Sequence, residues 1–112
     1  MQITTAKIQD SMHELSNAFF SVGYDLKVIS TDDVKITPTK FDDPKYMPKI
    51  NCRIRKNTEF NFLYLDISIS YPDMNSSEFE YLDSIVYNVA RWVRIARVIR
   101  LALEWKYKLP KE

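Results

Sequence analysis

The sequence predicts an α+β fold in which an N-terminal helix, an antiparallel sheet of three to four strands and a long C-terminal helix pack together. Apolar residues recur at helical spacing near both ends of the chain and alternate with polar residues between them. Turn-forming residues separate the alternating runs, as expected of antiparallel hairpins. The 112 residues are enough for one core without metal or disulfide support, so we expect a single domain over residues 1–112.

Residues 4–21 are predicted to form the N-terminal helix. Thr4 or Thr5 provides the N-cap, and Gly23 follows as the residue that ends the helix in a left-handed conformation. A narrow apolar stripe is expected to face the core, and it consists of Ile8, Met12, Leu15 and Phe19.

Two short strands are predicted on either side of residues 29–33, because apolar and polar residues alternate in both flanking runs. A connection over these five residues places Val28 opposite Val34. A four-residue connection would set each apolar residue against a polar one, so the sequence disfavours it. Residues 38–48 contain three prolines and no periodicity, and we expect a loop there.

A second hairpin is predicted from residues 49–55 and 60–71. Apolar residues occupy even positions in the first run and odd positions in the second. When these two sets face each other, a turn of two residues and a turn of four give the same pairing. That pairing places Cys52 opposite Leu63 on the core face.

The other face of this hairpin is predicted to combine basic and aromatic side chains. The facing pairs are Lys49 with Asp66, Asn51 with Tyr64, Arg53 with Phe62 and Arg55 with Phe60. Single-stranded nucleic acid is often bound in this way, with bases stacked on rings and phosphates met by arginine. The alternative is that these pairs make cation–π contacts on a face that the N-terminal helix covers. The candidate nucleic-acid-binding residues are Arg53, Arg55, Phe60, Phe62 and Tyr64.

Residues 77–107 are predicted to form one long helix, and a capping box from Ser77 to Glu80 marks its start. Its apolar residues fall on two roughly opposite arcs. The first arc is expected to lie on the sheet and comprises Leu82, Ile85, Val86, Val89, Trp92, Val93, Ala96, Ile99 and Leu103. The second arc comprises Ile95, Val98, Leu101, Ala102 and Trp105.

A helix on one sheet buries only one arc, so the second arc is expected to meet another layer. That layer is a second copy of the chain, the N-terminal helix or a foreign partner. Aromatic, aliphatic and arginine side chains are typical of interface centres. The candidate protein interface is therefore Arg94, Val98, Leu101 and Trp105.

The net charge is only +1, but the charges are unevenly distributed. Four acids lie near the start of the long helix, namely Asp73, Glu78, Glu80 and Asp83. Residues 91–112 instead hold seven Lys or Arg against two Glu. This arrangement suits the helix dipole at both ends, and the alternative is a basic surface for an acidic partner.

Several classes of chemistry are disfavoured by the composition. A single glycine, Gly23, does not provide a phosphate-binding loop. One Cys and one His, in separate elements, do not provide a catalytic pair or a zinc site. We therefore expect a protein that is not an enzyme and that uses no metal and no cofactor.

The start of the chain lacks a signal-peptide pattern, and no uncharged run is long enough to span a membrane. Cys52 has no second Cys to pair with. A cytoplasmic location is therefore expected.

These observations predict a small binding or assembly module that self-associates, as a homodimer, or binds a protein partner through the long helix. The alternative is a single-stranded nucleic-acid-binding protein that uses the Arg and aromatic face of the sheet. In outline, the order of elements resembles small phage-encoded inhibitors and export-chaperone subunits, a resemblance of architecture alone. The small size and low glycine content favour a phage or mobile-element source.

Overall fold

The predicted α+β order is confirmed. The computed structural model describes residues 3–39, 47–60, 62–70, 82–105 and 109, and it describes residues 82–90 by their backbone alone. The elements in chain order are α1 (Thr5–Ser11), α2 (His13–Ser21), β1 (Tyr24–Ser30), β2 (Asp33–Pro38), β3 (Lys49–Asn57), β4 (Phe62–Ser70) and α3 (Leu82–Glu104).

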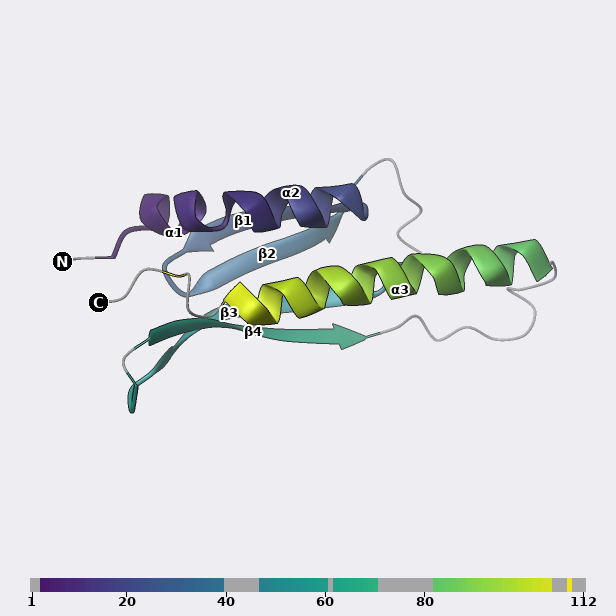
Figure 1. The fold of residues 1–112 in the computed structure, drawn as a ribbon. Helices are drawn as coiled ribbons and strands as arrows, with labels where there is room; N and C mark the ends of the chain where they lie inside the picture. Colours follow the sequence, from purple (N-terminus) through teal and green to yellow (C-terminus); the bar gives the residue numbers. More distant parts are fainter. Residues whose placement is uncertain (1–2, 40–46, 61, 71–81, 106–108, 110–112) are drawn as a thin grey trace.

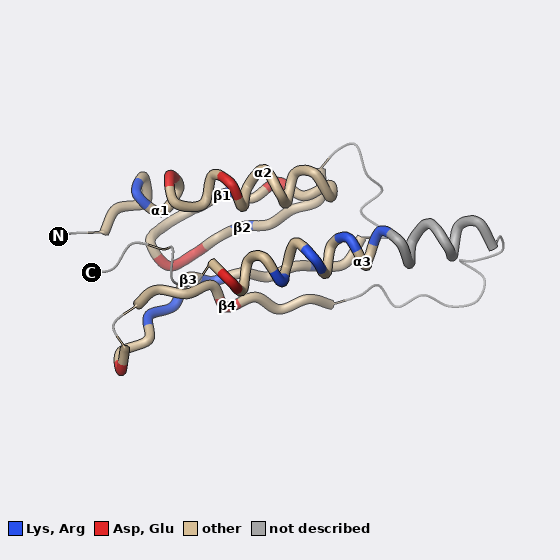
Figure 2. The backbone as a smooth tube through the Cα atoms, viewed as in Figure 1, with Lys and Arg blue, Asp and Glu red and all other residues tan. Residues whose placement is uncertain are grey.

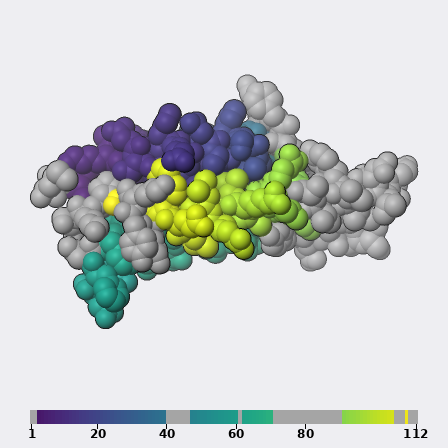
Figure 3. Space-filling view, viewed as in Figure 1, coloured from purple at the N-terminus to yellow at the C-terminus, as the bar shows by residue number. Residues whose placement is uncertain are grey.

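The helices and the sheet form two layers (Figure 1). The four strands are antiparallel and follow one another in the order β1-β2-β3-β4. Helices α1 and α2 pack on β1, and α3 packs on β4 and against α2. The space-filling view shows α2 and the C-terminal half of α3 side by side (Figure 3). All three helices contribute to one core on one face of the sheet, so none of them covers the other face, contrary to the alternative that the N-terminal helix lies over the aromatic residues.

The predicted N-terminal helix is divided in two at Met12. Thr4 is the N-cap, and its hydroxyl accepts a hydrogen bond from the Lys7 N–H at 3.3 Å. Met12 has φ −99° and ψ 6°, and its N–H is shared between the carbonyls of Ile8 and Gln9. The four residues of the predicted stripe are nevertheless buried, at 0–1% exposure. The break at Met12 therefore does not rotate the apolar stripe away from the core.

The first hairpin has the predicted pairing, with Val28 opposite Val34. It differs in its connection, because a β-bulge at Ile29 brings Ser30 opposite Asp33. The chain enters this hairpin through Gly23, whose φ of 91° would place a Cβ in a strained position. The glycine at this position thus has the predicted role of ending the second helix.

The second hairpin has the predicted faces but a different register. Cys52 lies opposite Ile67 instead of Leu63, and Lys49 lies opposite Ser70 instead of Asp66. The turn starts later than predicted, since the side chain of Asn57 accepts hydrogen bonds from the N–H groups of residues 59 and 60, each at 3.0 Å. A shift by an even number of residues keeps every side chain on its face. The predicted core positions of β3 and the first two of β4, Leu63 and Leu65, are therefore buried, whereas Ile67 and Ile69 are half-buried against the core.

The assignment of the two arcs of the long helix is wrong in its C-terminal half. Ile95 and Ala102, on the second arc, are fully buried, whereas Val93 and Leu103, on the first arc, are 48% and 51% exposed. Helical periodicity identifies both arcs but does not distinguish the one that fits between β4 and α2. The predicted capping box and the predicted end of this helix lie outside the described residues.

Candidate binding surfaces on the sheet and the long helix

An aromatic row runs along the open face of the β3–β4 hairpin. The Phe60 and Phe62 rings are stacked with centroids 6.5 Å apart, and the Phe62 and Tyr64 rings meet edge to face at 6.1 Å. Phe60 lies in the turn and is 68% exposed, while Phe62 and Tyr64 are half-buried. The structure thus brings the three predicted aromatic residues together in one continuous row.

The two predicted arginines lie beside this row, but with other partners than predicted. Arg55 is opposite Tyr64, and Arg53 is opposite Asp66. The Arg55 Nε donates to Asp66 Oδ2 at 2.8 Å in an exposed ion pair. Asp66 therefore offsets the charge of Arg55 instead of that of Lys49, its predicted partner, so one of the two candidate arginines already has an acidic partner. The face nonetheless offers rings and guanidinium groups on one open surface.

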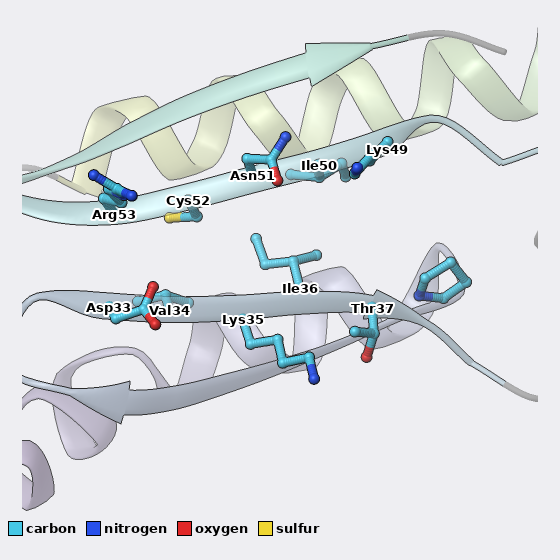
Figure 4. Close-up of a pocket in the computed structure, with 11 residues that line it drawn as sticks. Asp33, Val34, Lys35, Ile36, Thr37, Lys49, Ile50, Asn51, Cys52 and Arg53 are labelled. Carbon is cyan, nitrogen blue, oxygen red and sulfur yellow. The ribbon is translucent and has the colours of Figure 1, made fainter.

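A cleft separates β2 from β3 beyond their first pairs (Figure 4). The two strands pair at Asp33 with Arg53 and at Val34 with Cys52, and the pairing that would next bring Ile36 opposite Ile50 is not formed. The cleft has a volume of about 470 Å³. Three cations and one acid lie along it, namely Lys35, Lys49, Arg53 and Asp33.

The thiol of Cys52 borders this cleft but is not a reactive nucleophile. Its side chain is 4% exposed and belongs to the core. Burial raises the pKa of the Cys52 thiol to about 12, and the carboxylates of Asp66 and Asp33 add to the rise. A thiol with so high a pKa stays protonated near neutral pH.

The four predicted interface residues on α3 do not share one open surface. Arg94 is exposed, Val98 and Leu101 are half-buried, and Trp105 is 3% exposed within the core. The second arc therefore meets the sheet and α2 of the same chain.

A different set of residues lies along another side of α3, and we call it the outer stripe: Trp92, Ala96, Ile99 and Leu103. Ala96 and Leu103 are exposed, whereas Trp92 and Ile99 are half-buried and pack in part against the core. The outer stripe has the alternating four- and three-residue spacing of a helix-pairing seam, and the sequence continues the spacing upstream at Leu82, Ile85 and Val89. This seven-residue spacing is the signal that could have identified the surface from sequence.

The arginines of α3 divide between the inside and the outside of the molecule. Arg91 is 8% exposed, and its Nη2 lies 3.9 Å from the sulfur of buried Met47. Burial lowers the pKa of Arg91, the nearby Tyr24 opposes this change, and Arg94 adds to it. The other three, Arg94, Arg97 and Arg100, are exposed. Figure 2 shows basic residues at intervals along the described part of α3.

Comparison with models of protein families, with curated proteins and with solved structures found no match. Among the helices within the described ranges, none has the length and apolar character needed to cross a membrane. No cluster of three or more His, Cys, Asp or Glu side chains suited to a metal ion occurs in the same part of the chain. Function is therefore inferred from the surfaces themselves.

Proposed function

We propose that this protein is a non-enzymatic assembly module that associates with a second copy of itself through the outer stripe of α3. The observation that carries the proposal is the position of this helix. Its N-terminal half extends past the end of the sheet, and no other described helix or strand accompanies it there (Figure 1). A helix that extends past its described neighbours, and that carries a partly exposed apolar stripe in its C-terminal half, is expected to pair with another helix.

The energetics of the outer stripe support pairing. Leu103 is 51% exposed, and Val93, next to the stripe, is 48% exposed. Full burial of one Val or Leu side chain contributes about 1.5–3 kcal/mol. A two-fold axis places the same residues of both copies in the interface, so each position contributes once from each copy. A few such residues therefore offset part of the entropy that the two chains lose on association.

The charges along α3 favour an antiparallel pair. In the sequence, Glu78, Glu80 and Asp83 surround the start of the helix, whereas Arg94, Arg97 and Arg100 lie in its C-terminal half. An antiparallel arrangement brings the start of α3 in one copy, with Asp83 in it and Glu78 and Glu80 before it in the sequence, towards the three arginines of the other copy. A parallel arrangement would set like charges together.

Solution mass tests this proposal. We expect the wild-type chain to have the mass of a dimer by light scattering, and the double variant Ala96→Lys, Leu103→Lys to have the mass of a folded monomer. Both residues are exposed, so the core of each chain should be unaffected. Glu104→Lys is the matched control, because it introduces the same side chain at an exposed neighbour outside the stripe. A wild-type chain that remains monomeric at all concentrations would contradict the proposal.

A second candidate function is the binding of single-stranded nucleic acid by the open face of the sheet. It is supported by the continuous row of Phe60, Phe62 and Tyr64 beside Arg53 and Arg55. Bases stack on such rings without a sequence requirement. Binding of single-stranded DNA with an affinity that falls as salt rises is the test, and its variants are described below.

A further inference from the structure

The outer edge of β4 presents backbone groups that are directed away from the sheet. The Ile54 N–H donates to the Asp32 carbonyl at 3.2 Å. The backbone N–H and C=O groups of even-numbered residues of β3 therefore point towards β2, and those of odd-numbered residues point towards β4. These odd-numbered residues lie opposite even-numbered residues of β4, for example Arg53 opposite Asp66. The residues of β4 whose N–H and C=O groups point outward are therefore Leu63, Leu65, Ile67 and Ile69.

The opposite edge of the sheet, β1, carries features that discourage pairing. A bulge at Ile29 interrupts its regular backbone. The carbonyl of Val28 accepts a hydrogen bond from Gln9 Nε2 of α1 at 3.4 Å, which covers part of the edge. Lys27 and Asp25 add two charges along the strand. Natural sheets use such features to prevent edge-to-edge association.

The edge of β4 lacks these protections. Over its nine residues, Phe62–Ser70, the strand has no bulge in its pairing with β3, no proline and no lysine. Its single charged residue, Asp66, is already paired with Arg55. No other helix or strand in the described ranges lies along this edge (Figure 1). A long, regular edge with one charged residue, itself in an ion pair, is suited to accept another strand.

We propose that a second copy of the chain joins this one at β4, so that two four-stranded sheets continue as one eight-stranded sheet. This inference rests on the proposed self-association and specifies how it occurs. Helix α3 packs on β4 of its own chain, so an added β4 brings its own α3 to the same side of the sheet. A foreign strand would bind the edge but leave the outer stripe of α3 exposed, whereas a second copy covers both.

The register of this pairing is constrained by the alternation of side chains. Residues of β4 with odd numbers face the core in both copies, so an odd residue must lie opposite an odd residue. Asp66 directly opposite Asp66 would place like charges together and is disfavoured. Registers centred on Ile67 and on Ser68 both avoid that contact and keep both apolar faces on the helical side, and the one centred on Ser68 sets the two copies of Ser68 directly opposite each other.

Amide hydrogen exchange at several protein concentrations tests the inference on the unmodified chain. We expect the outward amides of Ile67 and Ile69 to exchange at least tenfold more slowly when the chain is dimeric than when it is diluted to monomer. The outward amides of Leu26 and Val28 on β1 are the control and should not respond. If the chain is dimeric by light scattering and the β4 amides do not change, the edge pairing is wrong while the proposed function stands. If the chain is monomeric throughout, both are wrong.

Disulfide trapping provides a second measurement. Ser68→Cys should give a covalent dimer on mild oxidation, and Ser30→Cys at the β1 edge should not. Native Cys52 is buried with a raised pKa, so it does not compete for oxidation. Equal trapping at the two edges would overturn the inference, because it would indicate random collision.

Discussion

At the scale of single residues, Cys52 illustrates how burial determines chemistry. The sequence places it on the core face of a strand, and there the structure finds it 4% exposed. Its two acidic neighbours, Asp33 and Asp66, could not be identified as such from the predicted register, which set other residues beside it. The inert character of the thiol was thus predictable from alternation, whereas its electrostatic environment was not.

The raised pKa of Cys52 predicts a loss of stability in alkali. The unfolded thiol ionises near pH 9.0, whereas the folded thiol ionises near pH 12. Between these values the unfolded chain has lost a proton that the folded chain retains, so the free energy of unfolding falls as pH rises from about 9 to about 12. Urea unfolding at several pH values in this range should show that the free energy of unfolding falls more steeply with pH for the wild type than for Cys52→Val, which lacks the titrating group. Equal slopes would indicate that the thiol is accessible to water.

At the scale of the elements, the β3–β4 hairpin shows which part of a register the sequence determines. Alternation of apolar residues fixes which face each side chain takes, and those faces are confirmed. It leaves the position of the turn open, since any shift by two residues preserves the faces. The hydrogen bonds of the Asn57 side chain select one position, and Asn57 was the available signal for it.

Replacement of Asn57 tests this account of the turn. Asn57→Ala removes the acceptor for two backbone N–H groups and should lower the free energy of unfolding by about 1 kcal/mol. Thr58→Ala, at an exposed position of the same turn, should change stability by less than about 0.5 kcal/mol. The two variants can be compared by urea unfolding. A larger loss for Thr58→Ala would show that another residue positions the turn.

The long helix shows a different limit of sequence reasoning. Two apolar arcs on one helix predict two contacts. The structure has one buried arc, and its outer stripe is partly exposed. The sequence does not say which arc fits the sheet, because that depends on the packing of side chains from β4 and α2. Hence the fold and most core positions followed from periodicity, but the candidate interface moved to the opposite side of the helix.

At the scale of the whole molecule, the distribution of helices decides whether the sheet can bind a ligand. All the described helices lie on one face, so none of them covers the aromatic row on the other. A net charge of only +1 does not favour nucleic-acid binding by the chain as a whole. Any such binding should depend on the local group of Arg53 and Arg55, and it should be strongly sensitive to salt.

A titration with single-stranded DNA at several salt concentrations tests this expectation. Phe62→Ala should weaken binding by about 1–3 kcal/mol without changing the salt dependence. Changing Arg53 and Arg55 to Gln should make the plot of log affinity against log salt concentration less steep. Its slope should fall in magnitude by roughly 0.7 for each phosphate that an arginine no longer neutralises. Phe20→Ala is the matched control, because Phe20 is 59% exposed on α2, away from the open face. Absence of binding at low salt would exclude this second function.

The protected edge of β1 has a consequence for how large an assembly can grow. When two copies join at β4, the combined sheet has a β1 strand at each end, and the bulge at Ile29 and the cover from Gln9 are present at both. Neither end can accept a further strand easily, so addition stops after one step. A rise in the concentration of the chain would therefore convert monomers into dimers without producing fibres, even though the edge of β4 is suited to pairing.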